Sequence, residues 1–390
     1  MASIAGDQPK TTYTDTTPQK TVIADFIDII DPRDVPVIKY FGLDGSPGKF
    51  DVVNWPGTKV YWLEDNLSTI DTALDGTWAS DWTTLNVTAG TGKYFKPGDL
   101  LRVYGAVSGT YEENIVRVSS ISTDALTVDP DYDGANPTGT VVESGATVKL
   151  IGSARTEGED ADYERSNTDV TEDYNYTQIF QDDLKISRTA DKIAQYGKAG
   201  EWDYQAAKKL PELMRQMART FYYGVRAEDS TSGSGIRSMG GLHQFLSTNT
   251  TDLSSAALTR KDIHDEMQNC WDEGGNPSLL ICNAWVKRKI SDMFEGYVRT
   301  ERSERTGGVI IDTIATEFGE LDILMDRWCP TDRLYLLEAQ YIGFLAYDPF
   351  FWEKLAKTGD AEKGQIVGEY TMVVKNEQAH AMIYGISTSS

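Results

Sequence analysis

The C-terminal part of the chain decides how it folds, and it reads Leu355-Ala356-Lys357-Thr358-Gly359-Asp360, then Glu369-Tyr370-Thr371, then Asn376-Glu377-Gln378-Ala379-His380. Gly359-Asp360 is a turn signal, because glycine and aspartate favour the backbone angles of turns. Residues 365–374 alternate in polarity and contain β-branched side chains, as a strand does, and a second short strand is predicted over residues 379–386. The pattern predicts a short Leu/Ala helix followed by a β-hairpin.

A strand followed by a long helix is predicted over residues 176–223. Residues 176–187 have the character of a strand, and residues 201–223 form an amphipathic pattern whose apolar stripe includes Trp202, Leu213 and Phe221. Pro211 lies inside this helix, where proline removes one backbone hydrogen bond and costs about 3 kcal/mol. We therefore expect a kink or a break at Pro211.

These two stretches resemble the major capsid proteins of tailed phages, in the SU-ten-like branch that has the Hong Kong 97 coat fold. The matching residues in the second stretch are Gln178-Ile179, Ser187, Thr189, Gly197, Glu201, Gln205, Lys208-Lys209-Leu210 and Glu212-Leu213. Asp31-Pro32 and Val35-Pro36 resemble the family's N-terminal arm, and Trp62-Leu63-Glu64-Asp65 with Leu67 resembles the start of its extended loop. The resemblance implies an α+β fold with an N-terminal arm, an extended loop, a peripheral domain with a long spine helix, and an axial domain.

Residues 83–152 differ in character from the rest of the chain, because short β runs alternate there with turns such as Lys96-Pro97-Gly98-Asp99. The runs are residues 85–88, 100–104, 115–121, 126–128 and 148–151. Regularly spaced short strands predict a small β-barrel. We interpret this barrel as a domain inserted into the extended loop.

The chain therefore divides into a series of predicted segments. They are the N-terminal arm (1–50), the first part of the extended loop (51–82), the inserted barrel (83–152), the return part of the loop (153–186), the peripheral domain with the spine helix (187–253), the axial domain (254–340) and the C-terminal part of the peripheral domain (341–390). In the axial domain we expect a helix capped by Thr259 and a second helix capped by Asn283.

Further elements are predicted along the chain. Strands are expected over residues 60–63, 278–282, 309–314, 321–325 and 334–337, a short amphipathic helix over 21–30, and a mobile Ser/Gly-rich loop over 230–241. Residues 341–347 and 349–352 form an aromatic-rich tract. The polar, Thr-rich residues 1–20 predict a tail that is disordered alone and becomes ordered when something holds it, often a neighbouring chain.

Composition narrows the class of protein. The chain has 390 residues, with 37 basic against 60 acidic side chains and a net charge of −23, whereas a free nucleic-acid binder would normally be basic. We favour solubility as the reason for the excess; an acidic shell would also not bind packed DNA tightly. Cys270, Cys282 and Cys329 are odd in number and form no C-x-x-C motif, so neither a zinc site nor a disulfide framework is indicated, as in a reducing cytoplasm.

Motifs for catalysis are weak. His243, His264 and His380 are the only histidines, none has a ligand-spaced partner, and no G-x-S-x-G elbow occurs. Gly90-Thr91-Gly92-Lys93-Tyr94 resembles part of a phosphate loop, but Val87 stands where the Walker pattern needs glycine and Tyr94 where it needs Ser or Thr. We interpret the stretch as a turn.

Clusters of acidic or basic side chains give only weak candidates for a binding site or a catalytic site. Asp129, Asp131 and Asp133 fit the first half of an EF-hand loop, but its twelfth position is Thr140 instead of Glu, so we favour a solvated loop over a weak Ca²⁺ site. The carboxylate pairs Glu112-Glu113 and Asp182-Asp183 carry little weight in so acidic a chain. A basic stripe on the long helix consists of Lys208, Lys209, Arg215 and Arg219. We favour a solvated face there; the alternative is a face toward packaged DNA or a neighbour's acidic loops.

The resemblance implies a major capsid protein that assembles into pentamers and hexamers of an icosahedral phage head enclosing double-stranded DNA. We expect no enzymatic activity and no catalytic, cofactor or metal site. The expected partners are further copies of the chain, portal and scaffolding or decoration proteins, and packaged DNA in non-specific contact, with no membrane. The expected location is the virion, after assembly in the host cytoplasm. Alternatives are a nanocompartment shell of the same fold, a decoration or tail protein, and a carbohydrate-active enzyme that uses the aromatic tract 347–352 to bind sugars.

Overall fold

The structure is a computed structural model. It describes residues 34–41, 57–65, 67, 71–79, 82–107, 110–130, 132, 141–155, 157–158, 170–193, 200–229, 235–294, 313–357 and 359–388. Contacts divide the chain into two compact units, residues 1–62 with 173–390 and residues 63–172. The predicted helix over 21–30 and the predicted tail over 1–20 lie outside the described residues.

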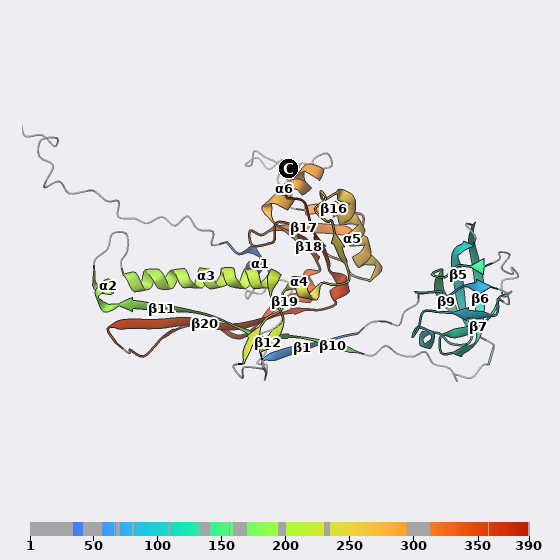
Figure 1. The fold of residues 1–390 in the computed structure, drawn as a ribbon, viewed down its shortest axis with the longest axis horizontal. Coiled ribbons are helices and arrows are strands. Elements are labelled where there is room, and N and C mark those ends of the chain that lie inside the picture. Colours follow the sequence, from blue (N-terminus) through green and yellow to red (C-terminus); the bar gives the residue numbers. More distant parts are fainter. Residues whose placement is uncertain are drawn as a thin grey trace, which may run out of the picture. The chain divides into compact units, whose positions relative to one another are not determined.

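A three-stranded antiparallel sheet and one long helix form the first part of the larger unit. The strands are β11 (Gln178–Ser187), β20 (Ala361–Val374) and β19 (Ile342–Lys354), in the order β11-β20-β19. Helix α3 (Glu201–Tyr223) runs alongside β11 and β20 (Figure 1). Successive side chains of β11 point to opposite faces of the sheet. Phe180 and Leu184 are therefore buried on one face, while Ile179 and Gln181 are exposed on the other.

Helix α3 is continuous through Pro211, so the predicted break is wrong. The stripe beyond the proline is fully buried at Leu213, Met217 and Phe221. Burying three such side chains contributes several kcal/mol, about 1.5–3 kcal/mol each, which exceeds the cost of one missing hydrogen bond.

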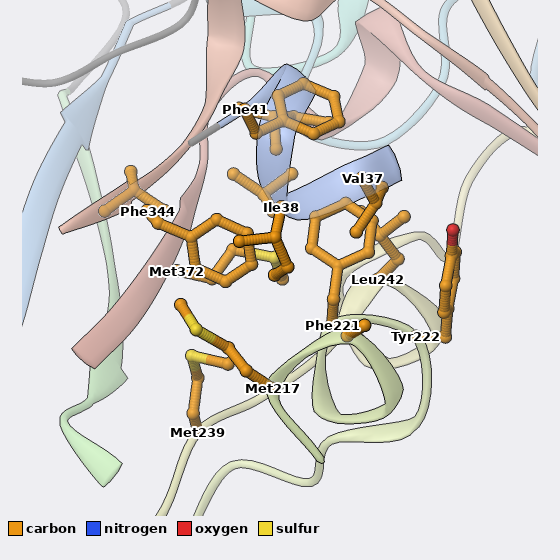
Figure 2. Packing of buried hydrophobic residues seen from close by; sticks show 14 of the residues in the cluster. Val37, Ile38, Phe41, Met217, Phe221, Tyr222, Met239, Leu242, Phe344 and Met372 are labelled. Atoms are coloured by element: carbon orange, nitrogen blue, oxygen red, sulfur yellow. The ribbon is translucent and has the colours of Figure 1, made fainter. Parts of the chain in front are cut away.

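The core beneath α3 is shared with a short helix near the start of the described chain. Helix α1 (Pro36–Tyr40) begins at a proline, which is favourable at a first helical position. Figure 2 shows Val37, Ile38 and Phe41 together with Phe221 of α3 and Phe344 of β19. The ring centroids of Phe41 and Phe221 lie 5.6 Å apart. This cluster fixes the segment that begins at Asp34 against the spine of the unit.

A six-stranded mixed sheet forms the second part of the larger unit. Its order is β14 (Thr250–Asp252), β21 (Ala381–Tyr384), β18 (Leu334–Leu337), β15 (Leu279–Cys282), β17 (Gly319–Met325) and β16 (Thr313–Thr316). The central strands β15 and β18 are buried at every residue, as their unbroken apolar runs predict. Along β15, Leu280 packs in a cluster with residues of helices α5 and α6, while Ile281 packs in the cluster that contains α3.

Both predicted helix caps of this part are confirmed. Helix α5 (Arg260–Asp272) starts with a full capping box between Thr259 and Asp262. Helix α6 (Ala284–Phe294) follows Asn283, whose side-chain oxygen accepts the N–H of Trp285 at 3.3 Å.

Two predictions for the C-terminal stretch are wrong. No helix follows Leu355; its N–H donates to the carbonyl of Lys363 at 3.0 Å, which continues the β19–β20 pairing. Strands β20 and β21 do not form a hairpin, because β20 pairs with β11 and β19 whereas β21 pairs with β14 and β18. Asn376, in the left-handed region at φ 49°, and the 3₁₀ turn η4 (Glu377–Ala379) redirect the chain between the two sheets.

His380 forms hydrogen bonds with both chain segments that connect the six-stranded sheet to the three-stranded sheet. Its Nδ1 accepts the N–H of Glu338 at 3.1 Å, so its Nε2 carries the proton and donates to the carbonyl of Lys375 at 3.2 Å. Burial lowers the pKa of His380 from 6.5 to about 4. A neutral imidazole is therefore part of the folded state.

The loop prediction for residues 230–241 is wrong in its second half. Strand β12 (Ala227–Asp229) pairs with β13 (Ile236–Ser238), and Met239 is fully buried in the core. Residues 230–234 lie outside the described residues. The remaining short elements of the larger unit are α2 (Arg188–Lys192), α4 (Leu242–Phe245) and the 3₁₀ turn η3 (Ala339–Tyr341).

The smaller unit is built on a six-stranded antiparallel sheet. Its order is β2 (Asp71–Ala73), β9 (Thr147–Ser153), β5 (Asp99–Val107), β6 (Thr110–Ser122), β7 (Ala125–Asp129) and β4 (Thr84–Asn86). A short pair, β3 (Trp78–Ala79) and β8 (Val141–Val142), accompanies it. All five strands predicted in this region are present. A bridge between Leu74 and Val87, which follow the two outermost strands, joins the ends of the sheet.

The chain leaves and re-enters the larger unit through a two-stranded pair. Its strands are β1 (Lys59–Glu64) and β10 (Thr171–Tyr176). The N–H of Thr177 donates to the carbonyl of Thr58 at 3.0 Å, which fixes the pair at its end nearest the larger unit.

Candidate assembly surfaces

The three histidines all have structural partners. His380 holds the crossing segments, and His243 lies 2.8 Å from a guanidinium nitrogen of Arg333. His264 accepts from Arg260 at 3.1 Å. Each histidine ring therefore has a hydrogen-bond partner that explains its position in the fold.

The Gly90–Tyr94 stretch is a turn, as predicted, and it ends in the 3₁₀ turn η1 (Gly92–Tyr94). The carboxylate of Asp124 accepts the N–H groups of Gly90 at 2.9 Å and Gly92 at 3.0 Å. These bonds lower the pKa of Asp124, so the carboxylate stays charged. A phosphate on the same N–H groups would compete with this negative charge, and the loop is therefore no phosphate site.

The paired carboxylates and the cysteines are also not arranged for catalysis, because the carboxylates point apart and the thiols are buried. Asp182 and Asp183 point to opposite faces of β11, because successive strand residues alternate, and Asp182 binds Lys209 at 3.1 Å. Burial raises the pKa of Cys270 and of Cys282 to about 12, and it raises that of Cys329 as well, so these thiols are unreactive.

No metal-binding site is found where the structure can be described. In the described ranges no three His, Cys, Asp or Glu side chains come together as a metal ligand set would. Asp129 ends β7, while Asp131 and Asp133 lie outside those ranges.

One face of the three-stranded sheet is covered and the other is open. Helix α3 covers the face that carries Phe180, whereas Ile179 on the opposite face is 53% exposed. Phe351 of β19 is 42% exposed, and its register partner on β20 is Val367, which in turn pairs with Gln181 of β11. We call the side chains of Ile179, Gln181, Val367 and Phe351 the open sheet face. Three of these four side chains are apolar, and the register partner of Ile179 on β20 is Glu369, which binds Arg237 of β13 at 3.2 Å. Exposed apolar side chains beside polar ones are typical of a protein–protein contact.

A group of aromatic rings surrounds a lysine on the β1–β10 pair. The Nζ atom of Lys59 lies 3.6 Å from the ring centroid of Tyr174, 4.9 Å from that of Tyr61 and 5.6 Å from that of Tyr176. Arg226 also lies over Tyr174, at 4.3 Å, and donates to its carbonyl at 2.7 Å. Such cation–π contacts are attractive because the negative face of the ring lies toward the cation. They hold the base of the segment that leads to the smaller unit.

The sequence reasoning missed this cluster. Its signal is a lysine and three tyrosines at alternate positions of two strands, residues 59 and 61 against 174 and 176. Alternation places each pair on one face, but only the pairing of β1 with β10 brings the two pairs together.

The basic stripe of α3 does not act as one surface. Lys209 binds Asp182 of the sheet at 3.1 Å and, within the helix, Glu212 at 3.3 Å. Lys208 lies over the ring of Tyr204 at 5.5 Å. Arg215 and Arg219 both lie over the ring of Trp328. Of the four predicted residues, only these two share one basic surface.

Among the helices of the described residues, none has both the length and the apolar composition needed to cross a bilayer. Helix α3 has 23 residues, but it is amphipathic and carries several charged side chains.

The fold is similar to solved capsid structures along nearly the whole chain. The capsid asymmetric unit of cyanophage A-1(L) matches with a TM-score of 0.56 at 9% identity, covering 97% of this chain and 100% of that chain. The capsid of a native GTA particle matches with a TM-score of 0.51 at 10% identity, covering 94% of this chain and 95% of that chain. The chain thus has the Hong Kong 97-like fold of phage capsid subunits.

The family follows from the sequence match. The model of the SU10 major capsid protein family matches residues 10–387, and the chain belongs to this family. Among curated proteins nothing matches the chain. A holo-SrpI encapsulin complex from Synechococcus elongatus matches with a TM-score of 0.41 at 7% identity, over 57% of this chain and 79% of that chain, which is too low to argue from. The protein is a major capsid protein, a structural part of the virion that associates with its own copies to form the shell.

Proposed function

We propose that the chain forms hexamers and pentamers that close into an icosahedral head around double-stranded DNA, and that it catalyses no reaction. The family match over residues 10–387 carries this proposal. Assembly would take place in the host cytoplasm, with a portal and with scaffolding or decoration proteins as further partners. Contact with the packaged DNA would be non-specific, because the chain carries a net charge of −23.

Each part of the fold then has a role. We assign α3 and the three-stranded sheet to the peripheral domain and the six-stranded sheet to the axial domain, which moves β14 and β21 out of the segments 187–253 and 341–390 that were predicted to be peripheral. The compact unit of residues 63–172, which contains the predicted barrel of residues 83–152, would be an insertion in the extended loop. The open sheet face would contact a neighbouring copy, because it leaves the apolar side chains of Ile179 and Phe351 exposed on the isolated chain. The lysine–tyrosine cluster would keep the base of the extended loop stiff enough to reach that neighbour.

Assembly of purified variants tests the role of the open sheet face. In Ile179→Asp a carboxylate would be buried without a partner in the contact, at a cost of several kcal/mol. We expect folded subunits with an unchanged melting temperature that form no particles in electron micrographs. Ile151→Asp is the matched control, because Ile151 is an equally exposed isoleucine on strand β9 of the smaller unit, at 54% against 53% for Ile179. Normal particles from Ile179→Asp, or equal loss in both variants, would remove the proposed role of this face.

The content of the particles tests the second half of the proposal. Particles produced in infected cells should contain nuclease-protected double-stranded DNA. Particles that instead enclose an enzyme and no DNA would identify a nanocompartment shell and contradict the proposal.

A further inference from the structure

The described chain begins at a small basic surface on helix α3. Glu212, Arg215, Gln216 and Arg219 line an open depression on this helix. The guanidinium carbons of Arg219 and Arg215 lie 4.9 and 5.9 Å from the ring centroid of Trp328. The Nε1–H of the same ring donates to the carbonyl of Asp34 at 2.9 Å. Trp328 therefore holds the first described residue beside both arginines.

The carboxylates near this surface are paired with other cations and do not neutralise the charge of Arg219. Lys209 neutralises Glu212 at 3.3 Å, and Lys39 binds Asp34 at 3.4 Å. In the portion of the chain that the structure describes, Arg219 forms no ion pair. Tyr223, one turn further along α3, is 53% exposed and extends the surface with an apolar ring. The surface thus suits a partner that carries both carboxylates and apolar side chains.

The residues that precede Asp34 carry three carboxylates and several apolar side chains, with Arg33 as their single basic residue. Residues 21–33 read TVIADFIDIIDPR, with Asp25, Asp28 and Asp31 at a spacing of three and apolar residues between them. In a helix, residues spaced by three differ by about 60° around the axis, so the three carboxylates would share one side. Asp31 precedes Asp34 by three residues, and its Cα can therefore lie no more than about 10 Å from that of Asp34.

We propose that the face of α3 formed by Arg215 and Arg219, with the ring of Trp328, is the docking site for residues 21–33 of the same chain. Docking within one chain is favoured because the attachment point at Asp34 already lies against this surface. It would set the direction in which residues 1–20 leave the subunit. The inference does not depend on the proposed function, because it concerns the single subunit before assembly.

Hydrogen exchange of the unassembled full-length chain tests the docking. Arg219→Gln should speed exchange of peptides from residues 21–33 by about two- to fivefold, the size expected for loss of a partly exposed ion pair. Asp31→Asn should have the same effect, and the double variant should exchange no faster than either single variant, since both remove one interaction. Lys208→Gln is the matched control on the same helix and should change nothing in these peptides.

Three results would overturn the proposal. The first is exchange in residues 21–33 that Arg219→Gln and Asp31→Asn leave unchanged. The second is protection that disappears on dilution, which would assign the site to a second copy. The third is an Arg219→Gln variant that keeps its protection but retains less DNA in particles, which would assign the arginines to nucleic acid.

Discussion

Acidification should weaken the link between the two sheets through His380. The ring is neutral in the folded chain, with its Nδ1 occupied by the N–H of Glu338, and burial lowers its pKa from 6.5 to about 4. Its folded-state pKa lies below its unfolded-state value, so the stability it contributes is present above pH 6.5 and is lost as the pH falls toward 4. Linkage over this interval gives a loss of about 2.5 kcal/mol between pH 7.5 and 4.5.

Urea unfolding of the unassembled subunit at several pH values measures this loss. His380→Gln removes the titrating group, so the difference in unfolding free energy between parent and variant should shrink as the pH falls from 7.5 to 4.5. Titrating groups that do not interact with His380 cancel in this difference. His243→Gln is the control at an exposed histidine; partial burial and the charge of Arg333 lower the pKa of His243 less than burial lowers that of His380, so its parent-minus-variant difference should change less with pH. A parent-minus-variant difference that stays constant over the whole pH range would refute the reasoning.

Three further predictions concern the stability of the two units. Phe221→Ala should lower the free energy of unfolding by about 3–5 kcal/mol in chemical denaturation, because the ring is fully buried against Phe41 and Phe344; a loss below 1 kcal/mol would contradict this packing. Tyr222→Phe should cost about 1.5–3 kcal/mol, since its hydroxyl donates to the buried carboxylate of Asp326 at 2.7 Å, and an unchanged melting temperature would argue against that bond. Replacing residues 66–169 by a short Gly/Ser linker should leave the larger unit folded with its own cooperative melting transition, whereas an insoluble product would show that the smaller unit is needed for folding.

Local patterns in the sequence predicted local structure well. Thr259 and Asn283 mark helix starts because capping depends on side chains next to the backbone groups that they bind. The buried strand Leu279–Cys282 was recognisable because four consecutive apolar residues suit a strand covered on both faces. The five strands of the smaller unit followed from turn residues at regular intervals.

Pairing between distant segments could not be predicted in this way. The alternation over residues 365–374 identifies a strand, but nothing in it selects β11 and β19 as partners over β21. Pro211 suggested a broken helix because its local cost is visible in the sequence, while the compensating burial of Met217 and Phe221 depends on the tertiary fold.

The assembly surfaces were harder to foresee than the family. The open sheet face requires the register of Val367 with both Gln181 and Phe351, and the lysine–tyrosine cluster requires the pairing of β1 with β10. The basic stripe on α3 was visible as a helical pattern, and so was the neighbour of Lys208, Tyr204, one turn earlier on the same helix. The contacts of Lys209 with Asp182 and of Arg219 with Trp328 depend on other elements that the helical pattern does not reveal.

The bridge between Leu74 and Val87 has a consequence for a protein that is present in many copies. The N–H of Thr88 donates to the carbonyl of Ala73 at 3.0 Å, and that of Asp75 to the carbonyl of Asn86 at 2.9 Å. The terminal strands of this sheet therefore satisfy one another's backbone groups, which an exposed edge would instead offer to the same strand of another molecule. At the high local concentration of a growing shell, the smaller unit is thereby protected from aggregating edge to edge.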